Sequence, residues 1–469
     1  MRAPTWLAGA LIAAAALLAP ASALAHAVPS SGEPPPGGTV AAAPEDVRLV
    51  LTVPVERAFL ELRVTTTDDV DVSGPAERDP LDDRAIQAPV DVPAAADGLV
   101  VHWRVLSEDG HAGGGVYGIG VGGPAPDVAG EASPVRSDHD PLSVAARFLA
   151  LSAPILLLGM VVLGAGIVGP AVARGGVGPP GEAPAVRSAV RARAAEALVG
   201  TVRGWWTAWF ALLAAWALGL VLTPVVTLRA LREGPGGLGD LLGDTAFGAA
   251  WRIQVAGLVV AVIATVVTRR ATGPEGLPDE IVPAVGLAFG PAGALYGISS
   301  SGHASTGGDR TLNIGIDLLH TLATAAWFGG LLALAVLVVP ALARLGDEDR
   351  TRFGAGVVVR FSALALTAVA VLVVTGVYRA LAEISPGELL DTGYGQALLV
   401  KLGLFAVLLC GGAYNRFVVH PRLERAALGL DPGDRGAATA LRVSVRAELV
   451  LAALLLVSVA VLVSLTPPG

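Results

Sequence analysis

Eight apolar stretches, each long enough to cross a bilayer as a helix, constrain the fold of this 469-residue chain more than any other feature. A helix rises about 1.5 Å per residue, so about 20 apolar residues span the hydrocarbon core. With 53% hydrophobic and 15% charged residues, the composition excludes an ordinary soluble protein. We expect an all-α polytopic membrane domain of about eight transmembrane helices within residues 143–469. The predicted helices cover residues 143–173, 204–228, 250–268, 281–300, 311–340, 357–382, 395–418 and 444–466.

The arginines predict how these helices are oriented. Residues 174–203 contain five arginines, and two further arginine-containing loops, at residues 344–352 and 416–425, fall on the same side of the predicted membrane. Short loops rich in Lys and Arg usually face the cytoplasm. We therefore expect a multi-pass protein of the cell (inner or plasma) membrane, with both ends of the mature chain on the extracytoplasmic side.

The N-terminal region resembles an export signal. Arg2 precedes an apolar stretch over residues 6–18, and small residues follow at positions 23–25. This arrangement is typical of a signal peptide, here predicted over residues 1–25. Cleavage after Ala25 would make His26 the first residue, so its α-amine and its ring could chelate one metal ion.

Residues 26–121 change to the pattern of a β domain. Apolar and polar residues alternate at 47–53, 60–64, 101–105 and 116–121, with Pro, Gly and Asp between these runs. This pattern predicts a small all-β sandwich of the Ig-like type. Residues 26–141 contain 20 Asp and Glu against 7 Arg, a balance that attracts cations and repels nucleic acid. Residues 122–142, rich in Gly, Pro, Ser and Asp, are predicted to be a flexible linker.

One tripeptide in this domain has the chemistry of a metal site. Asp109 and His111 flank Gly110, so a carboxylate oxygen and an imidazole nitrogen can converge on one ion. Together with the α-amine and ring of His26 they would supply three nitrogens and one oxygen. Such a set without sulfur suits copper(II).

The scarcity of sulfur narrows the class of metal site further. Cys410 is the single cysteine, which excludes an intramolecular disulfide and a thiolate cluster. Met160 is the one methionine besides Met1. A thioether-rich copper(I) site therefore cannot be built from this chain.

The outer domain resembles a known family. His26–Ala27, the Pro-rich turn up to Gly38, Trp103–Val105 and the run from Ser107 to His111 are similar to the periplasmic copper-binding protein CopC. The resemblance implies a β-sandwich with a copper(II) site near its N-terminus. It assigns His26, Asp109 and His111 as the metal ligands. The methionines of the copper(I) site that the family often carries are absent here.

A second group of polar residues lies within the apolar stretches. Asp317 precedes His320 by three residues, so the two share a helix face, and His303 ends the preceding stretch. Lys401, the one lysine of the chain, begins another stretch. Ionisable residues at membrane depth usually mark an ion or proton path. We expect a transport path through His303, Asp317, His320 and Lys401, although a buried pair that only fixes packing remains the alternative.

A further set of residues groups toward the inner ends of the last three helices. It comprises Arg360, Asn415, Arg446 and Glu448. Opposite charges near helix ends often pair or snorkel without moving anything. We interpret the set as a structural network, with an inner gate as the alternative.

The membrane region also resembles a family, the copper resistance protein CopD. The resemblance covers most of residues 143–466 and implies copper handling at the membrane, with movement toward the cytoplasm and a CopC-like part as collector. The matching fragments are Gly302-His303-Ala304, His320 with Trp327-Phe328-Gly329-Gly330, Arg360-Phe361-Ser362, Tyr394-Gly395 with Lys401, and Asn415-Arg416.

These features together predict a copper-binding and copper transport protein that serves copper homeostasis and resistance, and not an enzyme. No catalytic residues are assigned, and no Gly-rich loop ending in Gly-Lys-Ser/Thr is found. The expected ligand is copper(II) at the outer domain, and the expected partners are copper ions and membrane lipid, without nucleic acid. A copper(I) cargo would add a reductase, and import would add a cytoplasmic copper chaperone.

Two other functions are also compatible with the sequence. His303 and His320 could ligate haem in a membrane redox protein, as transmembrane histidines can. Alternatively, the outer domain alone could serve a copper-dependent oxidase or sensor, because two histidines with an α-amine resemble the copper brace of oxidative enzymes. Asp109 argues for binding over catalysis, since it would fill a position that an oxygen substrate needs.

Overall fold

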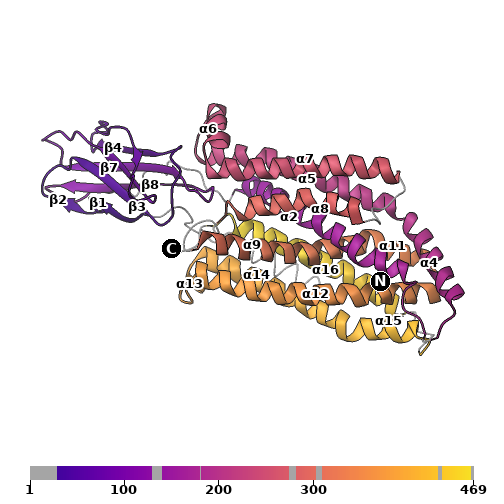
Figure 1. The fold of residues 1–469 in the computed structure, drawn as a ribbon. Helices are drawn as coiled ribbons and strands as arrows, with labels where there is room; N and C mark the ends of the chain where they lie inside the picture. Colours follow the sequence, from indigo (N-terminus) through magenta and orange to yellow (C-terminus); the bar gives the residue numbers. More distant parts are fainter. Residues whose placement is uncertain are drawn as a thin grey trace.

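The protein consists of an all-β domain at one end of a long helical bundle (Figure 1). The computed structural model describes residues 29–128, 140–179, 181–273, 281–302, 309–430 and 436–465. The predicted signal peptide, His26 and His303 lie outside the described residues. Within them, the expected fold class is confirmed: a β-sandwich is followed by an all-α membrane region.

The β domain is formed by two four-stranded sheets, with strand orders β1-β3-β6-β5 and β2-β8-β7-β4. Its interior follows the period of two: Leu49 and Val101 are fully buried and Trp103 is 3% exposed. Such side chains from both sheets form one core. The strands are β1 Pro29–Glu33, β2 Thr39–Val40, β3 Asp46–Leu51, β4 Glu61–Thr66, β5 Glu77–Arg78, β6 Ala85–Pro89, β7 Gly98–Leu106 and β8 Ala112–Val121.

The two longest strands, β7 and β8, form the hairpin that carries the candidate metal ligands. They pair antiparallel from Gly98 opposite Gly120 to Leu106 opposite Ala112. The connection is a turn over residues 107–111, in which Gly110 has φ +85°. A glycine adopts this left-handed conformation without the steric cost that a Cβ would bring. The hairpin therefore presents Asp109 and His111 at one end of the sandwich.

Seven helical segments of the described chain are long and apolar enough to cross a membrane. The remaining predicted span, residues 281–300, forms α8, which is apolar over Ala284–Ser299. The principal helices are α2 Pro141–Leu163, α4 Pro184–Val199, α5 Val202–Ala230, α6 Leu238–Gly243, α7 Ala246–Thr272, α8 Ile281–Ser299, α9 Arg310–Thr324, α11 Val339–Arg344, α12 Asp347–Glu383, α13 Glu388–Asp391, α14 Gly393–Tyr414, α15 His420–Ala427 and α16 Gly436–Leu462.

Several spans are extended by short π-helical turns. After α2 the π-helical turn η1 Gly164–Val168 leads into the short α-helix α3 Gly169–Ala173, and the π-helical turn η6 Asn415–Val419 joins α14 to α15. After α9 come η4 Ala325–Gly329, α10 Gly330–Ala333 and η5 Leu334–Val338. Gly159 of α2 and Gly329 of η4 lie in contact, and a Cβ on either would collide with the other segment's backbone. Small residues thus permit the close helix approach that is typical of membrane bundles.

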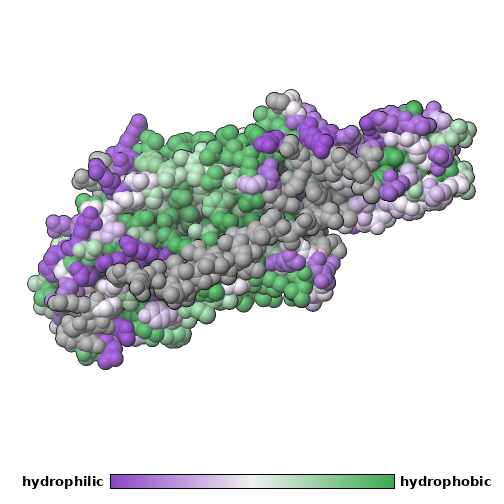
Figure 2. All heavy atoms as spheres, turned by 180° about the vertical axis from the view of Figure 1, so that it is seen from behind, coloured by the Kyte–Doolittle hydropathy of each residue, from purple (hydrophilic) through white to green (hydrophobic). Residues whose placement is uncertain are grey.

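The surface of the bundle has the polarity of a membrane protein. Figure 2 shows a hydrophobic band over the middle of the bundle and hydrophilic residues at its two ends and on the sandwich. Large apolar side chains are exposed within the spans, among them Phe289 at 69%, Leu366 at 66% and Val374 at 71%. Only lipid tails can solvate such a belt favourably. The chain is therefore a multi-pass membrane protein.

The sandwich is docked onto its own bundle. An apolar cluster joins Leu106 and Ala112 of the β7–β8 hairpin to Leu228, Leu231 and Leu241 around the end of α5 and on α6. The aromatic side chains of Phe59 and Phe247 pack against this cluster. The contact lies at the end of the bundle where α5 ends and α7 begins. Docking positions the turn 107–111 directly against the helices.

Candidate metal centre and membrane polar cluster

Asp109 and His111 form the centre of the candidate metal site. Oδ1 of Asp109 lies 3.1 Å from Nδ1 of His111, and the two residues are 6% and 7% exposed. Two donor atoms bound at about 2.0 Å and at right angles around one ion lie roughly 2.8 Å apart. The observed separation therefore suits two neighbouring ligands of a single metal ion. The two side chains are brought together by the tight turn.

The turn itself is fixed by hydrogen bonds. The backbone N–H of Gly110 donates to the carbonyl of Ser107 at 2.8 Å, and the N–H of Ser107 donates to the carbonyl of His111 at 2.9 Å. The Ser107 hydroxyl contacts the Asp109 carboxylate, and the N–H of His111 lies 3.3 Å from Asp109 Oδ1. These bonds hold the carboxylate and the imidazole in place before any ion arrives, which is the arrangement that a binding site needs.

His111 also contacts the membrane domain. Its Nε2 lies 2.9 Å from the carbonyl oxygen of Val463, the residue that follows α16. The last carbonyl groups of a helix have no partner within the helix. The imidazole therefore bridges the acidic turn of the sandwich and the end of the last helix.

Two acidic side chains, Glu233 and Glu56, form polar contacts between the sandwich and the membrane domain. Glu233 of the membrane domain pairs with Arg104 of β7 at 3.0 Å, and Arg104 also pairs with Glu61 at 2.7 Å within the sandwich. Oε1 of Glu56 accepts the backbone N–H of Ala246, at the start of α7, at 2.6 Å. Burial raises the pKa of the Glu56 carboxyl above its ordinary value of 4.5, and the hydrogen bond from Ala246 partly offsets this. The interface thus combines charge pairing, one buried carboxyl group and an apolar cluster.

Within the described residues, no group of three or more His, Cys, Asp or Glu side chains could hold a metal ion. Asp109 and His111 supply two ligands, and the third predicted ligand, His26, lies outside that part of the chain. The donors that are present, one carboxylate oxygen and one imidazole nitrogen, fit copper(II) and carry no sulfur.

The predicted path residues on α9 face the neighbouring helix α12. Nδ1 of His320 lies 2.9 Å from the hydroxyl of Thr375, and Asp317 pairs with Arg379. Both partners belong to α12. The i, i+3 spacing therefore brings the carboxylate and the imidazole to one interface, as the sequence predicts.

Arg379 is the centre of a cluster that sequence reasoning missed. Its guanidinium pairs with Asp317 and also with Glu383, one turn further along α12. The hydroxyl of Tyr394, on α14, donates to Glu383. An opposite-charge pair at i, i+4 near the end of residues 357–382 was the signal that could have found it.

Lys401 lies on α14, close enough to His320 for an electrostatic interaction between the two side chains. No ion pair or hydrogen bond of Lys401 is found among the described residues. The structure therefore places Asp317, His320 and Lys401 in one region around Arg379, although Lys401 does not join the paired carboxylates directly.

The membrane cluster and the outer site are connected through the end of α16. Tyr394 packs in an apolar cluster with Leu462 and Leu465, which flank Val463. Val463 contacts His111, and Tyr394 contacts Glu383. A continuous series of contacts thus leads from the sandwich turn to the Arg379 cluster.

The predicted inner set is only partly brought together. The Asn415 amide and the Ser444 hydroxyl both donate to Oε1 of Glu448, the latter at 3.2 Å, and Glu448 is 4% exposed. Arg446 is exposed, and Arg360 donates to the carbonyl of Gly356 at 2.6 Å. The described contacts therefore form an Asn415–Glu448 pair that neither arginine joins.

Another ion pair, which the sequence did not predict, lies at the end of the bundle opposite the sandwich. Buried Arg352, 2% exposed, pairs with Glu182 at 2.5 Å. Nearby, the Arg350 Nε donates to the Leu342 carbonyl at 2.8 Å.

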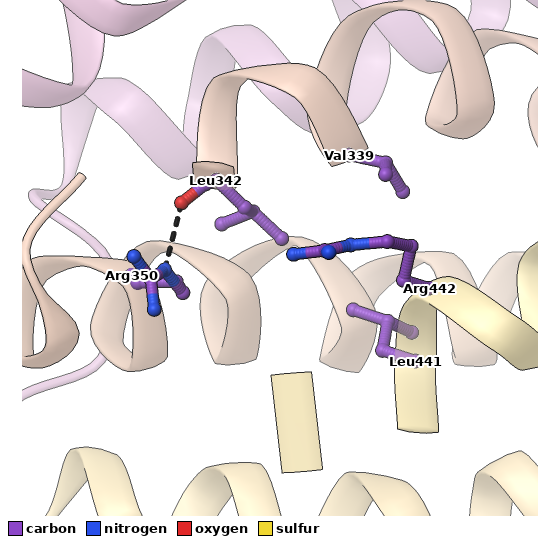
Figure 3. A pocket seen from close by; sticks show the side chains of 5 residues that line it. All are labelled: Val339, Leu342, Arg350, Leu441 and Arg442. Atoms are coloured by element: carbon purple, nitrogen blue, oxygen red, sulfur yellow. Dashed lines mark hydrogen bonds between the residues drawn. The ribbon is translucent and has the colours of Figure 1, made fainter. Parts of the chain in front are cut away.

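Figure 3 shows Arg442 directed toward Leu342 beside a cavity of about 10 Å³. This volume holds about one water molecule, so it offers no ligand site.

Comparison with known families follows the same division of the chain. The family model of the CopC domain matches residues 30–122. The model of the copper resistance protein D-like N-terminal domain matches residues 138–312, and that of copper resistance protein D matches residues 355–462.

Two curated relatives are similar to the chain. Copper resistance protein D of Pseudomonas syringae pv. tomato is 28% identical over 346 residues, which cover 70% of this chain and 98% of the relative. Copper transport protein CutJ of Bacillus subtilis (strain 168) is 30% identical over 224 residues, or 46% of this chain. The match spans 40% of the length of CutJ.

Solved structures are similar to the sandwich region. CopC from Methylosinus trichosporium OB3b is 30% identical and covers 20% of this chain and 93% of its own, with a TM-score of 0.19. The methionine-rich copper resistance protein PcoC from Escherichia coli is 24% identical and covers 21% and 99%, with a TM-score of 0.19.

Proposed function

We propose that the chain, whose successive regions match the models of the CopC domain, the copper resistance protein D-like N-terminal domain and copper resistance protein D, binds copper(II) outside the membrane and delivers copper into the helical bundle. The single observation that carries this proposal is the contact between His111 Nε2 and the Val463 carbonyl at 2.9 Å. It joins a candidate copper ligand to the helix end that packs on Tyr394, the neighbour of the Arg379 cluster.

At the outer site, His26, Asp109 and His111 act as the copper(II) ligands. The α-amine and ring of His26 complete the pair formed by Asp109 Oδ1 and His111 Nδ1, which are 3.1 Å apart. Nitrogen and oxygen donors without sulfur favour copper(II), and the strongly acidic sandwich raises the local concentration of cations. The domain lies on the extracytoplasmic side and collects the ion there.

In the membrane, the metal passes His303, Asp317, His320 and Lys401. The formal charges of Asp317, Glu383, Arg379 and Lys401 sum to zero, so the cluster is balanced before a metal enters. A cation that arrives must displace a positive group from a carboxylate, because uncompensated charge is costly at membrane depth. Arg379, which holds both carboxylates, is the group that must move. The chain thus imports copper and contributes to copper homeostasis and resistance.

Copper uptake by cells that express single-residue variants tests this function. His111→Ala should lower uptake at limiting copper, and His320→Ala should lower it at every concentration, because the first removes capture and the second removes a step in the membrane. His102→Ala, a partly buried histidine of β7 in the same sandwich, serves as the matched control and should transport normally.

Two results would contradict the proposal. Unchanged uptake by both His111→Ala and His320→Ala, at expression equal to the parent protein, would remove the path. A Soret absorption band in the purified protein that disappears in His320→Ala would favour the haem-binding alternative instead.

A further inference from the structure

We propose that the end of α16 is part of the outer copper site, because the Val463 carbonyl accepts the Nε2 proton of His111 and so presents Nδ1 to the metal. This inference deepens the proposed function and rests on it. It assigns the membrane domain a role in copper capture itself, in addition to its role in transport after capture.

The hydrogen bond to Val463 determines which ring nitrogen of His111 bears the proton. A backbone carbonyl can only accept a hydrogen bond, so the ring nitrogen 2.9 Å from the Val463 oxygen is the one that bears the proton in neutral His111. The other nitrogen, Nδ1, then has a lone pair available. It lies 3.1 Å from Oδ1 of Asp109, which is the other candidate ligand atom. Histidine ligands in metal sites commonly donate their second N–H to a carbonyl, which fixes tautomer and ring orientation.

The electrostatic field at this point favours a cation. Val463 directly follows α16, whose 27 residues run from Gly436 to Leu462. The last carbonyls of a helix carry a partial negative charge, equivalent to about half an elementary charge. This charge and the Asp109 carboxylate lie on opposite sides of the His111 ring. The hydrogen bond to the carbonyl also makes the ring a stronger donor toward the metal.

Docking is what brings the carbonyl to the ring, and two of its other contacts involve residues that are not ligands. Glu233 pairs with Arg104 at 3.0 Å. The ring of Phe247 packs over Gly110, so close that a Cβ on this glycine would lie 3.1 Å from Cδ2 of the ring. Docking can therefore be weakened through Glu233, whose partner lies outside the turn, and through Phe247, which packs on Gly110, without substituting Asp109 or His111.

Docking and copper binding are then linked. If docking strengthens copper binding by a given factor, copper strengthens docking by the same factor. Loss of a hydrogen-bond partner behind a metal ligand typically lowers metal affinity about 10- to 100-fold. The copper-loaded sandwich is thus held at the membrane entrance, where delivery takes place.

The test compares copper(II) affinity in the full-length protein with that of a docking variant, Glu233→Arg with Phe247→Ala. Affinity is measured by competition with a chelator of known strength, and the coordination by electron paramagnetic resonance. We expect about 10- to 100-fold weaker binding and a changed spectrum. The milder variant Glu233→Gln should shift both in the same direction and to a smaller extent.

The control variant is Glu196→Arg with Phe289→Ala, which alters one exposed acidic residue of α4 and one exposed phenylalanine of α8, neither of which is a docking contact. It should bind copper like the parent protein. Circular dichroism and gel filtration confirm that each variant is folded.

The outcomes distinguish the role of Val463 from the proposed copper function. Equal or tighter copper binding by folded docking variants, with an unchanged spectrum, overturns the role of Val463 and leaves the proposed function intact. A parent protein that binds no copper(II) overturns both.

Discussion

His111 and Val463 are 352 positions apart in the chain, yet the imidazole of the first lies 2.9 Å from the carbonyl of the second. The contact joins the turn of a β-hairpin to the end of the last membrane helix. It means that the sandwich is not merely tethered beside the bundle. Its candidate metal ligands face the helices directly, so the proposed capture and delivery of copper require no long movement of the domain.

The turn that carries these ligands requires a glycine for two independent reasons. Gly110 has φ +85°, and Phe247 fills the space in which a side chain would stand. Gly110→Ala should therefore introduce backbone strain, about 1 kcal/mol or more, and also displace the docking ring. We expect a lower thermal unfolding temperature and weaker copper(II) binding.

Gly122 provides the matched control for this prediction. It also has a positive φ, +67°, but a Cβ there would meet nothing within 4 Å. Gly122→Ala should show the strain cost alone and unchanged copper affinity. Equal effects of the two substitutions on copper binding would show that the contact with Phe247 is unimportant.

The stability of the docked protein should depend on pH through Glu56. Burial raises the pKa of this carboxyl above 4.5 in the folded, docked chain. The protonated form is therefore favoured by folding, and its stabilising contribution is fully present below pH 4.5. That contribution is lost as the pH rises through the raised pKa.

Glu56→Gln keeps the acceptor oxygen for the backbone N–H of Ala246 and removes the titration. We expect the variant to unfold at a higher temperature than the parent protein at pH 7, and the difference to shrink toward pH 4.5. Thermal unfolding followed by intrinsic fluorescence across this range measures it. Because both proteins share all other carboxylates, the comparison cancels their contributions. A difference that is constant with pH would exclude the role of Glu56.

Much of the fold followed from local patterns, because these patterns report burial residue by residue. The alternation at Val47, Leu49 and Leu51 predicted strand β3, and all three side chains are fully buried. The apolar stretches predicted the spans equally well, since a bilayer requires about 20 apolar residues for each helix. The predicted span at residues 281–300 likewise forms a helix, α8.

The site was only partly predictable, because its decisive contacts join distant parts of the chain. Asp109 and His111 lie two positions apart, so their convergence could be inferred from the turn. Their contact with Val463 depends on tertiary docking, about which local spacing carries no information. Arg379 escaped notice for a similar reason: its partner Asp317 lies on another helix.

Arg379 should be essential for the stability of the membrane cluster. Arg379→Gln leaves Asp317 and Glu383 without their shared cation, and breaking a buried ion pair costs about 3 kcal/mol or more. The three side chains are 17–21% exposed, so a cost near the lower end is expected. Thermal denaturation of the purified protein in detergent should show a lower midpoint.

A double substitution measures the energetic coupling between Arg379 and Asp317. Arg379→Gln combined with Asp317→Asn removes one of the orphaned carboxylates and should recover part of the loss. If the double variant is as unstable as the sum of both single variants, the pair makes no energetic contribution of its own.

The last prediction concerns the inner set, where sequence reasoning grouped Glu448 with two arginines and the structure pairs it with Asn415. Asn415→Ala removes an amide donor from a carboxyl group that is 4% exposed. The Ser444 hydroxyl remains as a second donor to Glu448, so the loss of this one hydrogen bond should cost about 1 kcal/mol and lower the unfolding temperature. Arg446→Gln changes an exposed residue on the same helix as Glu448 and should stay within about 0.5 kcal/mol of the parent protein. If instead Arg446→Gln is the more damaging of the two, the arginine pairs with Glu448 after all, and an ionic inner network replaces the amide–carboxyl pair.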